Sequence, residues 1–85
     1  MRKLSYNFHG ALRKCRILYD SEVSFLIAYD KVDFPFSAYV SVCRTSRQYY
    51  RVTALISFYD LKYTYIESFR NVELTALYID KILRR

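Results

Sequence analysis

The sequence predicts a small α+β domain in which an antiparallel sheet of three or more strands packs against a C-terminal helix. Apolar and polar residues alternate at period two through residues 38–67, which is typical of strands with one buried face. Residues 71–83 carry apolar side chains at helical spacing behind an asparagine, a favoured helix N-cap. Hydrophobic residues make up 53% of the 85-residue chain, too many for a disordered protein. We therefore expect one domain over residues 1–85.

The first residues fit two patterns. Leu4, Tyr6 and Phe8 alternate as in a strand, whereas Leu4, Phe8 and Leu12 also fall on one face of a helix. We favour a strand that ends near Phe8, because a helix across Gly10 costs about 1 kcal/mol relative to alanine. A second strand is expected from about residue 13 to residue 19.

A third strand is expected over residues 23–29, after a polar turn. Both of its faces are apolar, as in a strand that is covered on both sides. The competing interpretation is a helix capped by Asp20. Residues 1–34 are thus either strands or a helix-hairpin, and residues 30–35 link them to residues 36–85.

The second half of the chain has the clearer pattern. Strands are expected near residues 38–43, 50–58 and 62–67, with turns at residues 44–47 and at Asp60. The helix begins after Asn71, and its apolar stripe covers one face of the sheet. The residues of that stripe are Val72, Ala76, Ile79 and Leu83.

The formal charge of +6 is concentrated in blocks. Blocks of basic residues attract phosphate backbones or acidic protein surfaces. The alternative is a solvated surface with a basic bias that aids solubility. The candidate nucleic-acid-binding residues are Arg44, Arg47 and Arg51 near one turn, together with Arg13, Lys14 and Arg16.

Tyrosines mark a second candidate surface. We expect Tyr39, Tyr49, Tyr63 and Tyr65 on the sheet face opposite the helix. The favoured expectation is that residues 1–34 fold over this face and bury it. The alternatives are a homodimer or partner interface, where tyrosine and arginine are common anchors, and base stacking on single-stranded nucleic acid.

The segments YVSVCR, YRVTALIS and IESFRNVELTALYIDKIL carry a resemblance, with Phe69, Glu73, Ala76 and Asp80 at the matching spacing. Residues 39–83 resemble the ethylene-response-factor type of DNA-binding domain and the related arm-binding domain of phage integrases. The resemblance implies a three-stranded sheet, backed by one helix, that reads DNA through its exposed face. The family has glycine where this chain has Ser41 and Glu67. Its base-reading positions match Val40, Cys43, Leu55, Ser57, Tyr63 and Tyr65, none of which is basic.

The sequence offers no constellation of catalytic residues. His9 is the only histidine, and one glycine cannot build a phosphate-binding loop. One histidine with Cys15 and Cys43 supplies at most three ligands, whereas a structural zinc site usually takes four, so no metal or other cofactor is expected. Without a secretion signal or a membrane-spanning stretch, we expect a cytoplasmic protein with two reduced thiols.

Together these features predict a non-enzymatic binding module that engages nucleic acid or a nucleoprotein complex through its basic patches. The alternative is a small protein-binding inhibitor or adaptor, of viral or mobile-element type, that uses the tyrosine-rich face. Neither function involves a small-molecule substrate or a membrane.

Overall fold

The computed structural model describes residues 2–31 and 35–84 and contains one five-stranded antiparallel sheet with one α-helix. The strands lie in chain order, so each pairs with the one that follows it. The predicted α+β fold, with an antiparallel sheet packed against a C-terminal helix, is confirmed. The elements are η1 (Leu4–Phe8, a 3-10 helix), β1 (Arg16–Asp20), β2 (Ser24–Asp30), β3 (Phe36–Arg44), β4 (Tyr50–Phe58), β5 (Leu61–Phe69) and α1 (Val72–Leu83).

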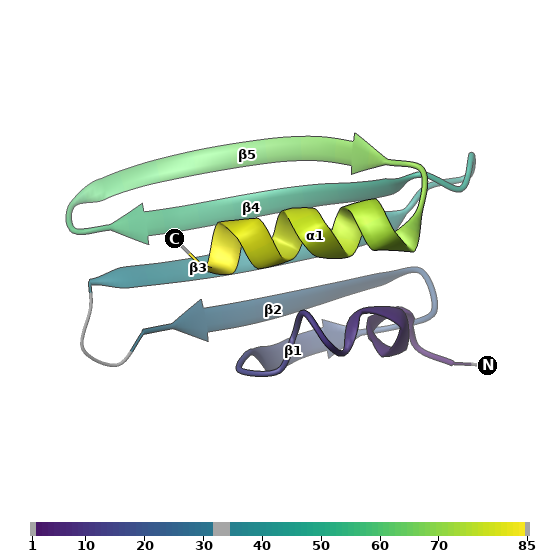
Figure 1. Ribbon diagram of the computed structural model, residues 1–85, viewed down its shortest axis with the longest axis horizontal. Coiled ribbons are helices and arrows are strands. Elements are labelled where there is room, and N and C mark those ends of the chain that lie inside the picture. The colour runs from purple at the N-terminus through teal and green to yellow at the C-terminus, as the bar shows by residue number, and fades with distance from the viewer. Residues whose placement is uncertain (1, 32–34, 85) are drawn as a thin grey trace.

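Both helices lie on the same face of the sheet. Figure 1 shows α1 across the middle strands and η1 beside it, in front of β1 and β2. Phe8 of η1 packs against Phe25 and Tyr50, with ring centroids 5.5 and 5.7 Å apart. Both partners belong to the sheet face that α1 covers. The core is therefore a single apolar layer between the sheet and the two helices.

Alternation along the strands places one set of side chains in this layer. The register pairs Val42 with Val52 and Val40 with Ala54, so these residues share a face. The fully buried sheet residues of this layer all lie on β2, β3 and β4. They are Phe25, Ile27, Phe36, Ala38, Val40, Val42, Val52, Ala54 and Ile56.

The helix begins where the sequence predicts it. The side-chain oxygen of Asn71 accepts a hydrogen bond of 2.8 Å from the backbone N–H of Leu74, which satisfies a free donor of the first turn. Thr75 is fully buried, and its hydroxyl donates to the carbonyl of Asn71. The apolar stripe faces the core, with Ile79, Ile82 and Leu83 buried.

Residues 4–8 do not form the expected strand. They form η1, and the spacing of Leu4, Phe8 and Leu12, the alternative considered from the sequence, is the one that reaches the core. In η1 both Leu4 and Phe8 are buried and Phe8 packs on Phe25 and Tyr50, so tertiary packing decides between the two local patterns. The second and third expected strands are confirmed as β1 and β2, so the helix interpretation of residues after Asp20 is wrong.

The C-terminal strands and turns agree with the sequence pattern. Residues 50–58 form β4, and a two-residue turn at Tyr59 and Asp60 connects it to β5. Tyr59 has a φ of 55°, so a non-glycine residue supplies the left-handed conformation that this short turn needs. Of the linker predicted over residues 30–35, residues 32–34 lie outside the described part of the chain.

The sheet face turned away from α1, which we call the open face, is not covered by residues 2–31. Those of them that the structure describes extend the sheet as β1 and β2 or pack as η1 beside α1. The expectation that they bury this face is wrong, because their apolar residues complete the core on the helix side. Leu55 and Ile66 on the open face remain 50% and 62% exposed.

A candidate nucleic-acid interface

The loop between β3 and β4 presents the first group of predicted basic residues. Thr45 closes the loop, because its N–H donates to the carbonyl of Tyr49 and its carbonyl accepts from Gln48, at 2.8 and 2.9 Å. The Thr45 side chain also accepts from the N–H of Tyr49. Arg44 and Arg47 are exposed on this ordered loop.

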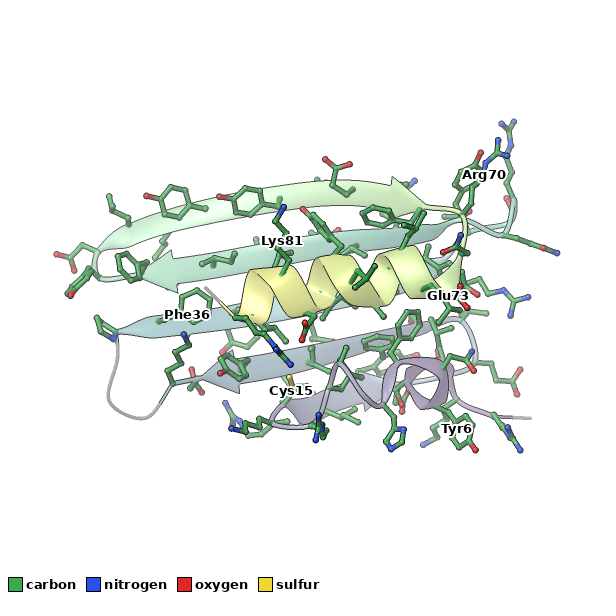
Figure 2. All side chains as sticks on the ribbon, in the orientation of Figure 1. Tyr6, Cys15, Phe36, Arg70, Glu73 and Lys81 are labelled. Carbon is green, nitrogen blue, oxygen red and sulfur yellow. The ribbon has the colours of Figure 1, made fainter. Side chains whose placement is uncertain are left out.

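A fourth arginine, not singled out from the sequence, joins this group. Arg70 follows β5, and its Nε donates to the hydroxyl of Tyr49 at 2.9 Å. The guanidinium carbon of Arg70 lies 5.4 Å from the centre of the Tyr49 ring, within reach of a cation–π interaction. Figure 2 shows Arg70 at the end of the molecule where β5 passes into α1.

The register explains why these residues meet. Arg44 pairs with Tyr50, and Tyr50 pairs with Phe69, which directly precedes Arg70. Arg51 lies one position along β4, on the open face. We call the resulting surface the basic end. It consists of Arg44, Arg47, Arg51 and Arg70, with Tyr49 beneath the last of them.

The N-terminus reaches the same end of the sheet. The N–H of Leu4 donates to the carbonyl of Ser21, and the N–H of Arg44 donates to the carbonyl of Val23 in the same turn. The exposed residues Arg2 and Lys3 line a pocket with His9 and Arg13 beside β1, so they form a separate basic group at the edge of the sheet. Arg2 stacks over the ring of Tyr6, 4.4 Å from the centroid.

The basic end is not neutralised by ion pairs. Within residues 2–31 and 35–84, no salt bridge involves any of its four arginines. Glu73 in the first turn of α1 lies at this end too (Figure 2), where it suits the positive end of the helix dipole. The arginine charges are thus available to a ligand.

The second predicted basic group lies toward the other end of the sheet. Arg16 pairs with Ala28 on the open face and forms an exposed salt bridge with Asp30, with a nitrogen–oxygen distance of 3.1 Å. Arg13 and Lys14 instead line a shallow pocket between the η1–β1 loop and the C-terminal turn of α1. Its other lining residues include Cys15, Tyr29, Asp80 and Arg84. The structure does not bring the two predicted basic groups together.

The four predicted tyrosines do not share one face. Tyr39 is on the open face, where it is 48% exposed. Tyr63 pairs with Ile56 and Tyr65 with Ala54, so both point to the helix side of the sheet, where Tyr65 packs against the core and Tyr63 stays 42% exposed. Tyr49 belongs to the basic end. The prediction of a single tyrosine-rich face is wrong because the alternation in β5 is offset by one residue from the one assumed.

The described residues contain no candidate metal-binding cluster. Among them, no group of three histidine, cysteine, aspartate or glutamate side chains could hold a metal ion. Cys15 and Cys43 carry free thiols, and burial raises the pKa of the Cys15 thiol. Ser5 donates a short hydrogen bond to Asp20, which ties η1 to β1.

Comparisons with known proteins identify no relative of this chain: no family model, curated protein or solved structure matches it. The resemblance to the ethylene-response-factor type of domain therefore stays a prediction. The segment from β3 to α1 is a three-stranded sheet with one helix, but β1 and β2 extend that sheet. Of the positions that match the family's base readers, Cys43, Leu55 and Ser57 lie on the open face. No helix in the described residues is long and apolar enough to cross a membrane.

Proposed function

We propose that the chain is a small, non-enzymatic module that binds the phosphate backbone of nucleic acid through its basic end. The observation that carries this proposal is the convergence of Arg44, Arg47, Arg51 and Arg70 at one end of the sheet without ion-pair partners among the described residues. Phosphate contacts supply most of sequence-independent affinity for nucleic acid.

The hydrogen-bonded loop of residues 45–49 favours phosphate binding over the alternative that the basic residues only aid solubility. Three hydrogen bonds within residues 45–49 hold the loop, so its arginines lose less conformational entropy when they bind a phosphate. Guanidinium groups also bind phosphate oxygens in a bidentate manner. The ring of Tyr49, with Arg70 beside it, offers a flat surface next to these donors.

The module is expected to bind without strong sequence preference. The open face near Arg51 presents Ser24, Cys43 and Ser68 in the same row, which lack the paired donors that read a base edge. Affinity therefore depends on charge, and it should be similar for oligonucleotides of equal length and different sequence.

Fluorescence anisotropy with labelled oligonucleotides at low salt tests this proposal. The double variant Arg44→Glu with Arg47→Glu should weaken binding of every sequence alike, by about tenfold or more, since each lost phosphate contact costs on the order of 1 kcal/mol. Both side chains are exposed, so the fold should persist. The matched control is Arg13→Glu with Lys14→Glu, which changes the net charge equally at the other end of the sheet.

If the two double variants lose affinity equally, net charge and not the basic end governs binding, and the proposal is wrong. Absence of binding by the wild-type chain at low salt would refute it directly.

The alternative of a protein-binding inhibitor or adaptor stays a hypothesis. It was motivated by a tyrosine-rich face, but only Tyr39 of the four tyrosines lies on the open face. What favours a protein contact is the exposure of two apolar side chains on that face, Leu55 near its centre and Ile66 on the edge strand β5.

A further inference from the structure

The open face has a regular pattern across β2, β3, β4 and β5. The register defines four rows that cross these strands. At the end away from the basic end, the first row runs from an acid through two serines to a base. In order from that end, the rows are Asp30–Ser37–Ser57–Lys62, Ala28–Tyr39–Leu55–Thr64, Leu26–Ser41–Thr53–Ile66 and Ser24–Cys43–Arg51–Ser68.

These rows are nearly symmetric about the line between β3 and β4. The third row has an apolar residue at each end and two hydroxyl side chains between them. The second row has its two large side chains, Tyr39 and Leu55, in the middle. The first row has opposite charges at its ends, Asp30 and Lys62. A surface with this pattern is complementary to a copy of itself that is turned over about that line.

We propose that a second copy of this chain covers the open face, through a two-fold axis that runs parallel to the strands between β3 and β4. The rotation places β2 opposite β5 of the second copy and β3 opposite β4. The two sheets pack face to face about 10 Å apart, and because the axis is parallel to the strands, each central strand runs in the same direction in the two copies. The contact is isologous, because each surface meets the same surface.

This arrangement matches chemistry in the first three rows. Asp30 lies opposite Lys62 of the second copy, and the rotation produces this charge pair twice. Leu26 lies opposite Ile66, and Tyr39 lies opposite Leu55, each of them twice. Arg16 keeps its salt bridge with Asp30 at the rim of the contact. The like charges that approach each other are the two Arg51 side chains, which lie in the row next to solvent, where salt screens them.

The size of the face suits a small interface between two copies. Each row takes one residue from each of four strands that lie about 4.8 Å apart, and successive rows are about 7 Å apart along the strands, so the four rows cover roughly 500 Å² on each copy. This area is toward the lower end of specific interfaces. Its centre is apolar and its rim is charged, which is the usual anatomy of a specific interface.

The same axis adds a consequence that rests on the proposed function. A two-fold axis parallel to the strands keeps both basic ends at the same end of the dimer. The two basic ends then lie at one end of the dimer, so a single nucleic-acid strand that crosses this end contacts both of them. The dimer itself forms without nucleic acid, so its test is independent of the binding test.

Size-exclusion chromatography with light scattering on the nuclease-treated full chain tests the dimer. The wild type should have twice the mass of one chain. Leu55→Glu, in the centre of the open face, should give a folded monomer by mass and circular dichroism. Leu77→Glu is the matched control, because Leu77 is 65% exposed on the outer side of α1 and should leave the dimer intact.

A charge exchange tests the axis. In an Arg16→Ser background, which removes the salt bridge within the chain, Lys62→Asp places two carboxylates opposite each other at both ends of the first row. The dissociation constant should rise about 10- to 100-fold, since two charge pairs are lost for each dimer. Adding Asp30→Lys should return it to near the value of the Arg16→Ser protein.

A wild-type chain that is monomeric up to millimolar concentration overturns the proposal, and so does an open face occupied by oligonucleotide instead of a second copy. A dimer that survives Leu55→Glu places the interface elsewhere and overturns it too. If Asp30→Lys fails to rescue Lys62→Asp, the dimer does not have this axis.

Discussion

Replacement of Ile79 by alanine should be among the most destabilising single changes in α1. Ile79 has no exposed surface and lies at the centre of the helix stripe that faces the sheet. Deletion of a buried isoleucine side chain beyond Cβ costs about 2–5 kcal/mol, because apolar contacts are lost and a cavity remains. A domain of this size has a free energy of unfolding near the lower end of about 5–15 kcal/mol. The change therefore removes a large fraction of the stability.

Urea denaturation followed by circular dichroism at fixed protein concentration measures this loss. With an m-value of about 1 kcal/mol/M for a small domain, the urea midpoint should fall by about 2–5 M. The midpoint temperature of thermal unfolding should fall by roughly 4–8 °C for each kcal/mol of lost stability. Ile79→Val should cost only about 1 kcal/mol, because it removes one methyl group.

Leu77→Ala is the matched control on the same helix. Its side chain is exposed, so the free energy of unfolding should change by about 0.5 kcal/mol or less. Equal losses for the two alanine variants, or an unchanged midpoint for Ile79→Ala, would refute the packing of α1 on the sheet through this stripe.

Three further predictions concern local features. Asn71→Ala removes the acceptor for the N–H of Leu74 and should lower the free energy of unfolding, measured by thermal unfolding, by about 1 kcal/mol. Asn71→Asp keeps an acceptor and should be nearly neutral, so equal losses for both variants would argue against the cap. In the monomeric variant Leu55→Glu, iodoacetamide should modify Cys43 before Cys15, as read by mass spectrometry, because Cys15 is half-buried and burial raises the pKa of its thiol. The two rates should converge in denaturant, and a faster reaction at Cys15 would contradict its burial. Gln48→Val should lower the free energy of unfolding by about 1 kcal/mol or more, measured by thermal unfolding, because Gln48 has a φ of 64°, which β-branched residues rarely adopt. Gln48→Gly should not destabilise the chain, since glycine adopts this φ readily.

The strands and the helix of the second half could be predicted because their signals are local. Residues 50–58 alternate without interruption, and Asn71 is followed by a regular apolar stripe. Residues 4–8 could not be assigned this way, since Leu4 and Phe8 satisfy both periods. The secondary structure of residues 4–8 depends on a tertiary contact, the packing of Phe8 on Phe25 and Tyr50.

The candidate site could be predicted only in part. The sequence marks Arg44, Arg47 and Arg51 as a group because they are close in the chain. Arg70 lies about twenty residues away, and only the pairing of β4 with β5 brings it to Tyr49. The face of Tyr63 and Tyr65 was missed for a related reason. Both sets of alternating residues in β5 contain apolar side chains, so the pattern alone does not choose a face.

The salt dependence of nucleic-acid binding tests the central claim most directly. For a single-stranded oligonucleotide, the logarithm of the association constant should fall against the logarithm of salt concentration with a slope of about −3 or steeper, since four arginines each release about 0.7 counterion. The slope should become shallower by about 1.4 in the variant Arg44→Glu with Arg47→Glu. A slope near zero in the wild type, or an equal slope in both proteins, would contradict phosphate binding by the basic end.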